Sequence, residues 1–392
     1  ITIIHVDALQ KLIDARFTAE TGIKARISIM PDANKLVLAS AAGTAPDIAL
    51  ALESYRPFEL ASRGAAYDMT TFDDFWEVAG RFAPGSIVPF IFNSGVFALP
   101  ESLDFYALAY REDIFRSLNL TPPDTWEDVG EIMPELQRYG MNFYHPIASG
   151  DGYKWYYQTS PLIFQNGGKI YSDDGLRVAL DSPEAVKGIA ELGELFTTYA
   201  LSEQIPVFFN AFRSGTVPAG IIDLNTYLVL KNGAPELTGQ WNLAPFPGTT
   251  QADGSVSRWF ITNGRCGMIF KDTDKADDCW SFFKWWLSED IQTEYAFTLQ
   301  STYGPLFMWL PSNLAAVANS SLNERDKQVI LEQVRWLRDV PRTPGQYMTE
   351  RSLSDIWNMI VFDGVSAQVA IDSKLIVIQR EMKRKMIEYG FL

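Results

Sequence analysis

The chain has 392 residues, more than one ordinary hydrophobic core accommodates, and this length predicts two compact lobes. Its 33 Lys and Arg against 48 Asp and Glu give a formal charge of −15, which argues against nucleic acid and anionic lipid as partners because both require a concentrated positive surface. The hydrophobic share is 47%, as in globular proteins, and no run of residues approaches the roughly 18 apolar positions of a membrane helix.

The N-terminal part alternates strand-like runs with segments of helix length. We expect, in order, a strand over 1–6, a helix over 7–20, a strand over 23–29, a helix over 33–42 and a strand over 47–52. This β-α-β-α-β order predicts an open, mostly parallel sheet that is covered by helices.

Candidate binding residues follow two of these predicted strands. Asp7 lies just after the first strand, and Glu53 and Tyr55 lie just after the third. Open α/β sheets bind ligands at the carboxyl ends of their strands. We therefore expect these three side chains near a ligand.

The rest of the chain is predicted to be richer in helix. Thr125 has the features of a helix N-cap, and Asp128 three residues later completes the signature of a capping box. Further strands are expected at 218–222, 241–244 and 266–270. The last third is expected to form helices at 274–286, 288–299, 324–337, 349–362 and 366–389.

The sequence offers few residues for metal, redox or catalytic chemistry. Its two histidines, His5 and His145, have no metal-ligand spacing, and no motif marks a nucleophile, a phosphate loop or a dinucleotide site. We expect no metal, no cofactor and no catalytic residue. Cys266 and Cys279 are predicted to be buried thiols, with a single bridge between them as the alternative.

Several short motifs occur in an order and spacing that resemble one family. They are FTAETGIK at 17–24, AGTAPDI at 42–48, AFRSG at 211–215, APFPG at 244–248 and GMIFK at 267–271. Together they resemble the extracellular solute-binding proteins of bacterial ABC importers, in the class that contains maltose-binding protein and other sugar receptors. The C-terminal run 379–391 is more similar to the large Gram-positive lipoprotein receptors of this family.

The resemblance implies a two-lobed, class II periplasmic-binding-protein-like fold, in which each lobe is a mostly parallel sheet flanked by helices and the C-terminal third is helical. The expected N-terminal lobe is 1–105 with 260–306, and the C-terminal lobe is 106–259 with 307–392. The expected hinge crossings are near 100–106, 256–261 and 305–311.

The implied function is that of a carbohydrate receptor. The lobes would close around an oligosaccharide and present it to the permease subunits of an ABC transporter, with no chemistry on the ligand. The receptor is expected to be a monomer outside the cytoplasmic membrane, periplasmic or as a cell-surface lipoprotein. Any secretion signal or lipid anchor is expected to lie outside the given residues.

A sugar site needs flat aromatic rings for stacking and polar side chains for hydrogen bonds. In addition to Asp7, Glu53 and Tyr55, the candidates are Trp155, Tyr156, Tyr157, Asp223, Asn225, Tyr227, Arg258, Trp259 and Arg351. For each aromatic ring the alternative is an ordinary role in a core. Arg351 and Asp355 are also spaced for a surface ion pair, and Trp357 on the same predicted helix is expected in the core.

A secreted glycoside hydrolase is the alternative function. Such an enzyme would also be acidic and rich in aromatic residues, and it would need two carboxyl groups across the scissile bond. The 48 acidic residues leave that pairing open, but no Asp or Glu stands in a motif that marks an acid or base. Formation of products from oligosaccharides would separate the enzyme from the receptor.

Overall fold

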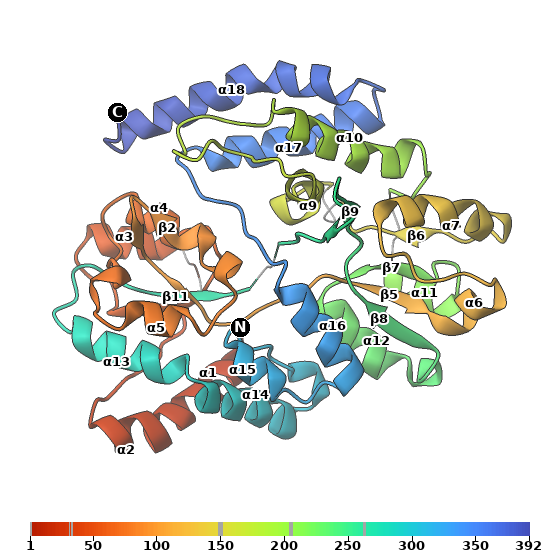
Figure 1. Cartoon of the computed structure of the whole chain (residues 1–392). Helices are drawn as coiled ribbons and strands as arrows, with labels where there is room; N and C mark the ends of the chain where they lie inside the picture. Colours follow the sequence, from red (N-terminus) through yellow and green to blue (C-terminus); the bar gives the residue numbers. More distant parts are fainter. Residues whose placement is uncertain (1, 31, 33, 148–151, 204–206, 262–263) are drawn as a thin grey trace. The chain divides into compact units, whose positions relative to one another are not determined.

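The structure is a computed structural model that describes residues 2–30, 32, 34–147, 152–203, 207–261 and 264–392 (Figure 1). The chain divides into two compact units. Unit 1 contains Ile1–Asp104 and Asn263–Asn323, and unit 2 contains Phe105–Thr262 and Glu324–Leu392.

This division differs from the sequence-based one by one and three residues at the first two boundaries, and by residues 307–323, which belong to unit 1. The physical reason is local packing. Helix α15 (Leu314–Ala318) and the turn before it contact helix α14 (Glu289–Tyr303). The buried side chain of Asn313 donates a hydrogen bond to the carbonyl of Leu287 at 3.0 Å. The third passage between the units therefore falls at residues 323–324, later than the predicted 305–311.

Unit 1 is built on a three-stranded sheet in the order β1 (Ile48–Leu52), β11 (Cys266–Ile269) and β4 (Leu99–Pro100). Both pairings are antiparallel, so the expectation of a mostly parallel sheet is wrong here. The neighbour of β1 comes from a segment more than half the chain away, and a local βαβ rhythm does not determine the direction of such a strand. The predicted strands at 47–52 and 266–270 are confirmed.

The N-terminal segment is helical from Ile3 onward, so the predicted strand over 1–6 is wrong for the described residues. Helix α1 (Ile3–Leu12) continues into a π-helical turn at Ile13–Phe17 and then into α2 (Thr18–Thr21). The buried side chains of this segment recur every three or four residues, which is helical spacing. They are Ala8, Leu9, Leu12, Ile13 and Phe17. A six-residue apolar run at the start of such a pattern does not distinguish a strand from a helix.

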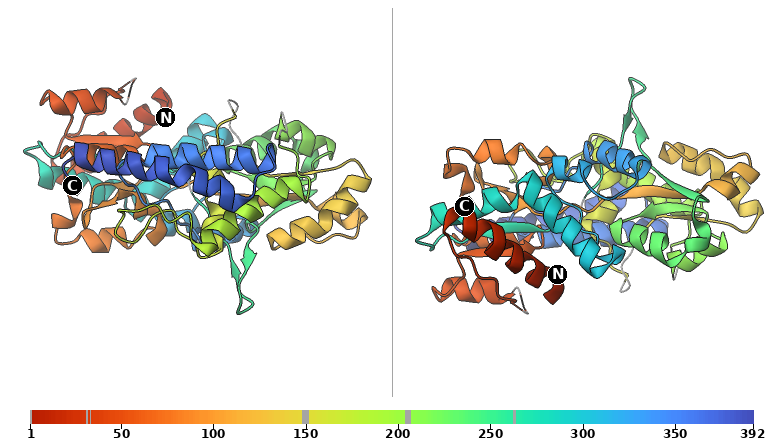
Figure 2. Two further views of the ribbon diagram at one scale, coloured as in Figure 1. Left: turned by 90° about the horizontal axis from the view of Figure 1, so that it is seen from above. Right: turned by 90° about the horizontal axis from the view of Figure 1, so that it is seen from below.

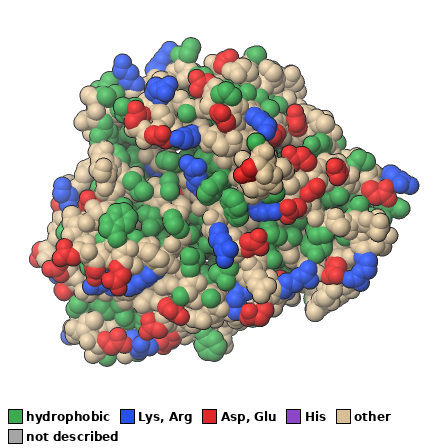
Figure 3. All heavy atoms as spheres, in the orientation of Figure 1, with side chains coloured by type: hydrophobic (Ala, Val, Ile, Leu, Met, Phe, Trp, Pro, Cys, Tyr) green, Lys and Arg blue, Asp and Glu red, His purple; other side chains and the backbone are tan. Residues whose placement is uncertain are grey.

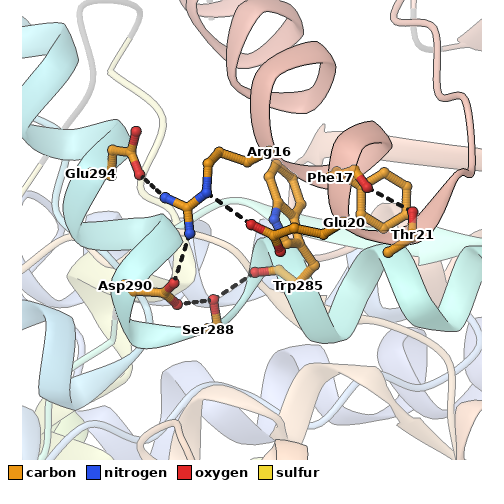
Figure 4. Close-up of polar contacts among 8 residues, drawn as sticks. All are labelled: Arg16, Phe17, Glu20, Thr21, Trp285, Ser288, Asp290 and Glu294. Carbon is orange, nitrogen blue, oxygen red and sulfur yellow. Dashed lines mark hydrogen bonds and ion pairs between the residues drawn. The ribbon is translucent and has the colours of Figure 1, made fainter.

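Arg16 links this N-terminal helical segment to helix α14 (Figure 4). Its guanidinium contacts Glu20 at 2.8 Å, Glu294 at 2.6 Å and Asp290 at 3.4 Å. One cation is thus shared among three carboxylates. These side chains are partly exposed, so each pair contributes little alone, and most of the attachment comes from the buried Phe17 ring against Phe282 and Trp285.

The segment 23–29 is extended but forms no strand ladder among the described residues, so the predicted strand is wrong. Alternate apolar side chains of this segment, Ile23, Ala25 and Ile27, pack on the core of unit 1. The side chain of Gln10 forms hydrogen bonds with main-chain groups of this segment, as a neighbouring strand would. It accepts the N–H of Ile27 at 2.9 Å and donates to the carbonyl of Ala25 at 3.1 Å.

The remaining helices of unit 1 cover its sheet. The predicted helix over 33–42 appears as α3 (Asn34–Ala41), and position 33 itself lies outside the described residues. The others are α4 (Arg56–Ala61), α5 (Phe75–Ala79) and α13 (Ala276–Trp286). The predicted helices over 274–286 and 288–299 are confirmed as α13 and α14.

Unit 2 is built on a four-stranded sheet in the order β6 (Phe143–Tyr144), β7 (Ala219–Ile222), β5 (Ala107–Arg111) and β8 (Trp241–Ala244). Only β6 and β7 pair in parallel, whereas β5 is antiparallel to both β7 and β8. The mostly parallel sheet is therefore wrong for unit 2 as well. The predicted strands at 218–222 and 241–244 are confirmed, and three of the four strands run in one direction.

One helix of unit 2 begins where the sequence predicts. Thr125 accepts the N–H of Asp128 at 3.1 Å, and Asp128 accepts the N–H of Thr125 at 2.9 Å, so the capping box of α7 (Trp126–Arg138) is confirmed. The shorter helices are α6 (Glu112–Ser117), α8 (Tyr156–Thr159), α9 (Pro161–Gln165), α11 (Phe208–Ser214) and α12 (Leu224–Gly233).

The longer helices complete unit 2. They are α10 (Pro183–Thr197), α16 (Glu324–Val334), α17 (Gln346–Val361) and α18 (Ala367–Glu388). The predicted helices over 324–337, 349–362 and 366–389 are confirmed. The blue helices α17 and α18 lie side by side in both views of Figure 2, and α10 packs on both. Among the described residues, no helix combines the length and the apolar character needed to cross a membrane.

The surface carries charges of both signs. On the face drawn in Figure 3, acidic and basic side chains are interspersed. Several ion pairs of the protein join residues four apart in the chain, as in Arg116–Glu112 on α6 and Lys169–Asp173 outside the helices. Such exposed pairs add little to stability.

Candidate ligand-binding site

The ends of three strands of the unit 2 sheet, β5, β7 and β8, lie at the same edge. The register pairs Ala107, the first residue of β5, with Ile222, the last residue of β7. Ala244, the last residue of β8, pairs with the next residue of β5. The residues directly beyond the first pair, Tyr106 and Asp223, therefore lie at the same edge of the sheet.

The aromatic rings of Tyr106 and Tyr157 are stacked at this edge. Their centroids lie 5.7 Å apart and their planes are 11° from parallel. Tyr157 belongs to the short helix α8, is half-buried, and packs on the hydrophobic cluster that also supports Trp259. The structure thus brings the predicted residue Tyr157 to the sheet edge. Sequence reasoning missed Tyr106, which lies just before a fully buried strand and carries no motif of its own.

Asp223 and Asn225 are located where β7 passes into α12. The Asp223 carboxylate accepts the N–H of Thr226 at 2.8 Å and so caps that helix. Asn225 is exposed in the first turn. Burial raises the pKa of Tyr144, at the end of the neighbouring strand β6, and the charge of Asp223 raises it further. Asp223 is thus a half-buried carboxylate at the strand ends, partly engaged by its own helix.

Trp155 is an exposed aromatic ring on a fixed backbone. Its surface is 41% exposed, and the ring of Tyr153 meets it edge to face at 4.7 Å. The next residue, Tyr156, donates its N–H to the Glu350 carboxylate at 2.9 Å, and Lys154 donates its N–H to the Ser354 hydroxyl at 3.2 Å. These bonds to α17 hold the main chain on both sides of Trp155, so its ring can remain exposed in one place.

Trp259 is half-buried beside a cation. Its ring meets Trp336 edge to face at 5.6 Å, and the Arg338 guanidinium lies 5.7 Å from its centre. The Trp259 carbonyl accepts from the Gln165 side chain at 3.2 Å, which fixes the main chain. Burial lowers the pKa of Arg338. Trp336 and Arg338 follow helix α16, and no spacing in the sequence marks them as neighbours of Trp259.

Two predicted aromatic residues belong to the core instead of a ligand surface. Tyr156 is 3% exposed, and its hydroxyl contacts the Tyr171 hydroxyl at 2.8 Å and donates to the Gln346 carbonyl at 3.0 Å. Tyr227 is also 3% exposed and donates its hydroxyl to the Asp326 carboxylate at 2.7 Å. Their polar atoms are satisfied inside unit 2, so the structure corrects their predicted contact with ligand.

Arg258 is likewise corrected to a structural role. It is buried, donates to the carbonyls of Asp124 and Phe246 at 2.7 and 3.0 Å, and forms an ion pair with the Asp124 carboxylate at 2.5 Å. These bonds attach the segment after β10 (Val256–Ser257) to the start of α7. These bonds engage both terminal nitrogens of the guanidinium inside unit 2.

Arg351 and Trp357 lie on helix α17. The predicted ion pair of Arg351 with Asp355 is wrong, because Asp355 pairs with Lys374 on α18 at 2.8 Å. Arg351 is exposed, and its contact with ligand stays a prediction. Trp357 is 3% exposed, which confirms its expected place in the core.

In unit 1, the predicted pair Glu53 and Tyr55 follows β1 as expected. Glu53 pairs with Arg265 at 3.0 Å and with Arg56 at 3.8 Å, and the Arg56 guanidinium lies 4.9 Å from the centre of the Tyr55 ring. Arg56 also pairs with Glu59 at 3.1 Å, so the loop and Arg265 together form a small cluster of two carboxylates, two guanidiniums and one phenol. Neither arginine was predicted, although Arg56 is adjacent to Tyr55 in the sequence.

Asp7 does not lie at a strand end, because it occupies an exposed position in helix α1. The reason for placing it near the ligand is therefore wrong. Cys266 and Cys279 are both buried free thiols, as predicted, and burial raises the pKa of Cys279 to about 11. Within the part of the chain that the structure describes, no three His, Cys, Asp or Glu residues are grouped to hold a metal ion.

Comparison with solved structures identifies the fold. Over 98% of this chain and 97% of the other, the sugar-binding protein MalE from Xanthomonas citri superposes with a TM-score of 0.82 at 16% identity. The cyclic alpha-maltosyl-1,6-maltose binding protein from Arthrobacter globiformis superposes with a TM-score of 0.78 at 18% identity, over 97% and 96% of the two chains.

A solute-binding protein of an ABC transporter from Thermotoga lettingae, bound with alpha-D-tagatose, gives a TM-score of 0.69 at 19% identity over 97% of each chain. These likenesses assign the two-lobed α/β fold of class II periplasmic binding proteins. No curated protein matches the sequence significantly.

The family follows from the sequence itself. The family model described as bacterial extracellular solute-binding protein matches residues 4–293, which is well over half of the chain. The matched range includes β1, the whole sheet of unit 2 and the loops that carry Glu53, Tyr55, Trp155 and Trp259. Its members are binding proteins and not enzymes, and this chain belongs to the bacterial extracellular solute-binding proteins.

Proposed function

We propose that the chain is a carbohydrate receptor that binds an oligosaccharide and delivers it to an ABC importer. The observation that carries the proposal is the set of aromatic rings in unit 2 formed by Trp155, Trp259 and the half-buried Tyr157, which is backed by the buried ring of Tyr106. Aromatic faces pack well against the C–H faces of sugar rings. Asp223 and Asn225 at the sheet edge supply partners for hydroxyl groups.

The names of the structural relatives point to the same ligand class. Those relatives bind sugars, among them a cyclic maltosyl-maltose and tagatose. Because their sequence identity to this chain is below 20%, the residues that contact ligand are argued from this chain alone. In unit 1 we place Glu53 and Tyr55 in the site, and Arg351 in unit 2 remains a further candidate.

The proposed mechanism is closure of the two units on the ligand. The chain passes between the units near residues 104–105, 262–263 and 323–324. A ligand that contacts both units stabilises the closed state by its differential contacts, and the closed state is the form that the permease subunits recognise. We place the receptor outside the cytoplasmic membrane, as a periplasmic protein or a cell-surface lipoprotein, and as a monomer.

A thermal-shift screen against a broad panel of mono- and oligosaccharides tests the proposal. A receptor shows a rise in Tm with one class of sugar, while chromatography after prolonged incubation recovers that sugar unchanged. A glycoside hydrolase would yield shorter products. No shift with any sugar, together with a shift produced by amino acids or peptides, would assign the protein to another ligand class.

A further inference from the structure

One carboxyl group of unit 1 is buried and fully engaged. Glu101 directly follows β4 and is 4% exposed. One carboxylate oxygen accepts the N–H of Ala51 at 2.5 Å, and the other accepts the indole N–H of Trp286 at 2.8 Å. Its main chain is also fixed, because its N–H donates to the Arg265 carbonyl at 2.8 Å and its carbonyl accepts from Gln292 at 3.0 Å.

The partner Ala51 has an unfavourable backbone conformation. Its φ is 58°, in the left-handed region that costs energy for residues other than glycine. The pairing of β1 with β11 is irregular between Ala49 and Leu52, so Ala51 lies in a β-bulge. A bulge removes a main-chain N–H from the ladder and redirects the strand that follows. In this bulge the freed N–H is satisfied by the Glu101 carboxylate.

The chain that follows the bulge carries the unit 1 candidates. Glu53 is two residues beyond Ala51, and its carboxylate pairs with Arg265 at 3.0 Å. The carbonyl of that same Arg265 accepts the N–H of Glu101. Glu101 is therefore connected to the loop after β1 in two ways. Its carboxylate binds the N–H of Ala51, and its N–H binds the carbonyl of Arg265, whose side chain pairs with Glu53.

We propose that Glu101 is a positioning residue, whose carboxylate holds the bulge at Ala51 and thereby fixes Glu53 and Tyr55 in the geometry that binds a carbohydrate. This inference rests on the proposed function. Glu101 is buried and acts through the loop, so it does not itself contact the ligand. Bulges that redirect side chains are frequent next to binding sites, and the energy of the strained Ala51 must be offset by such a bond.

The ionisation of Glu101 gives this arrangement a dependence on pH. Burial raises the pKa of Glu101 to about 7, while its bonds to Ala51 and Trp286 and the charge of Arg265 oppose the rise. The other ionisable group that faces it is Tyr295 on α14, whose pKa is raised by burial and by Glu101, and whose hydroxyl donates to the His5 carbonyl. Protonation turns one acceptor oxygen into a hydroxyl, which weakens the hydrogen bond from Ala51 or the one from Trp286.

The test compares Glu101→Gln with the matched control Trp286→Phe. The glutamine side chain would present an amide N–H₂ to one of the two donors, whereas the control keeps the carboxylate and its bond to Ala51. We measure the Kd of the best sugar from the screen by calorimetry between about pH 5.5 and 8.5, a range that spans the titration of Glu101.

Wild type is expected to bind about tenfold more tightly at the alkaline end of this range than at the acidic end, because the ionised carboxylate holds both donors. Glu101→Gln is expected to bind at the weaker level throughout. Trp286→Phe is expected to keep a pH-dependent affinity, with the transition moved to higher pH because the indole N–H that lowers the pKa of Glu101 is lost. Wild-type affinity and profile in Glu101→Gln would overturn the proposal.

A second measurement does not need a ligand. Hydrogen exchange of residues 51–55, corrected for intrinsic rates, is expected to be faster in Glu101→Gln than in Trp286→Phe and wild type. In wild type alone, the same segment is expected to open more often below about pH 7 by an opening that breaks the bond to Ala51 and leaves Glu101 buried, because that bond favours the ionised carboxylate. Full unfolding, which exposes Glu101 to water, has the opposite pH dependence. The wild-type measurement keeps the test decisive if Glu101→Gln fails to fold. Absence of sugar binding by wild type would contradict the proposed function, while unchanged exchange at 51–55 would contradict the role of Glu101.

Discussion

The ring of Tyr157 lies against the ring of Tyr106, with centroids 5.7 Å apart and planes 11° from parallel. This contact joins helix α8, which begins directly after the exposed Trp155, to the residue just before strand β5. It therefore sets the position of one aromatic face relative to the sheet edge that carries Asp223.

We expect Tyr157→Ala to weaken sugar binding about tenfold and to lower the free energy of unfolding by about 1 kcal/mol, because it removes a stacked pair. Calorimetry and urea unfolding measure the two effects. Tyr157→Phe keeps the ring and serves as the control for the fold. If the phenylalanine variant lost as much affinity as the alanine variant, the phenol hydroxyl would be the important group and the stacking account would be incorrect.

Trp155→Ala and Trp259→Ala are each expected to weaken sugar binding by roughly 1–3 kcal/mol, since each removes an aromatic face of the proposed site. Trp76→Ala is a matched control, because Trp76 is a tryptophan with 67% of its surface exposed on helix α5 of unit 1. Calorimetry with one sugar compares the three variants. Equal losses in all three would show that the effect is not specific to the unit 2 rings.

His145 is expected to make the protein sensitive to acid. It is 3% exposed beside the Trp126 ring, neither ring nitrogen has a hydrogen-bond partner among the described residues, and burial lowers its pKa from 6.5 to about 3. The unfolded chain therefore binds a proton below pH 6.5, whereas the folded chain does not until about pH 3. The stability that is present above pH 6.5 is lost as the pH falls toward 3.

Between pH 6.5 and about pH 4.5 the free energy of unfolding is expected to fall by about 3 kcal/mol, at about 1.36 kcal/mol per pH unit. Urea unfolding of His145→Leu at about pH 7 and pH 4.5 measures it, and the variant is expected to lose less stability on acidification than wild type. Glu101 acts in the opposite direction: its raised pKa contributes stability that is fully present below about pH 4.5 and is lost as the pH rises through about 7. Wild type and His145→Leu both retain Glu101, so the difference between their free energies of unfolding reports on His145 alone. If both lost the same stability on acidification, the role of His145 would be refuted.

Thr125→Ala is expected to lower the free energy of unfolding by about 1 kcal/mol, because it removes the side-chain oxygen that accepts the N–H of Asp128. Thr125→Ser retains an acceptor oxygen and should recover most of the loss. Chemical denaturation of the three proteins gives the comparison. A serine variant as unstable as the alanine variant would mean that the methyl group, and not the cap, is responsible.

Local signals in the sequence predicted the local features well. The capping box of Thr125 and Asp128, the short strand over 241–244 and the long C-terminal helices all depend on nearby residues, and the structure confirms them. Strand direction depends on which remote segment becomes the neighbour. This is why β1, which pairs antiparallel with β11, was expected in a parallel sheet.

The candidate site was predicted less completely than the fold. Glu53 and Asp223 do follow strands, as the sequence indicated, and their contact with ligand stays a prediction. Position after a strand did not separate exposed rings from buried ones. Tyr156 and Tyr157 are adjacent in sequence, and yet one hydroxyl is enclosed by Tyr171 while the other ring stacks at the sheet edge. Glu101 could not be found from sequence, because its role depends on the bulge at Ala51, a remote position in the chain.

The central claim is that this protein holds a carbohydrate and leaves it chemically unchanged. One titration tests it most directly: calorimetric binding of the oligosaccharide that gives the largest thermal shift, with chromatography of the same sample afterwards. We predict saturable one-to-one binding, recovery of the intact sugar, and weaker binding by Trp155→Ala. Heat that continues after saturation together with shorter sugars in the sample, or no binding by any sugar in the panel, would contradict the account.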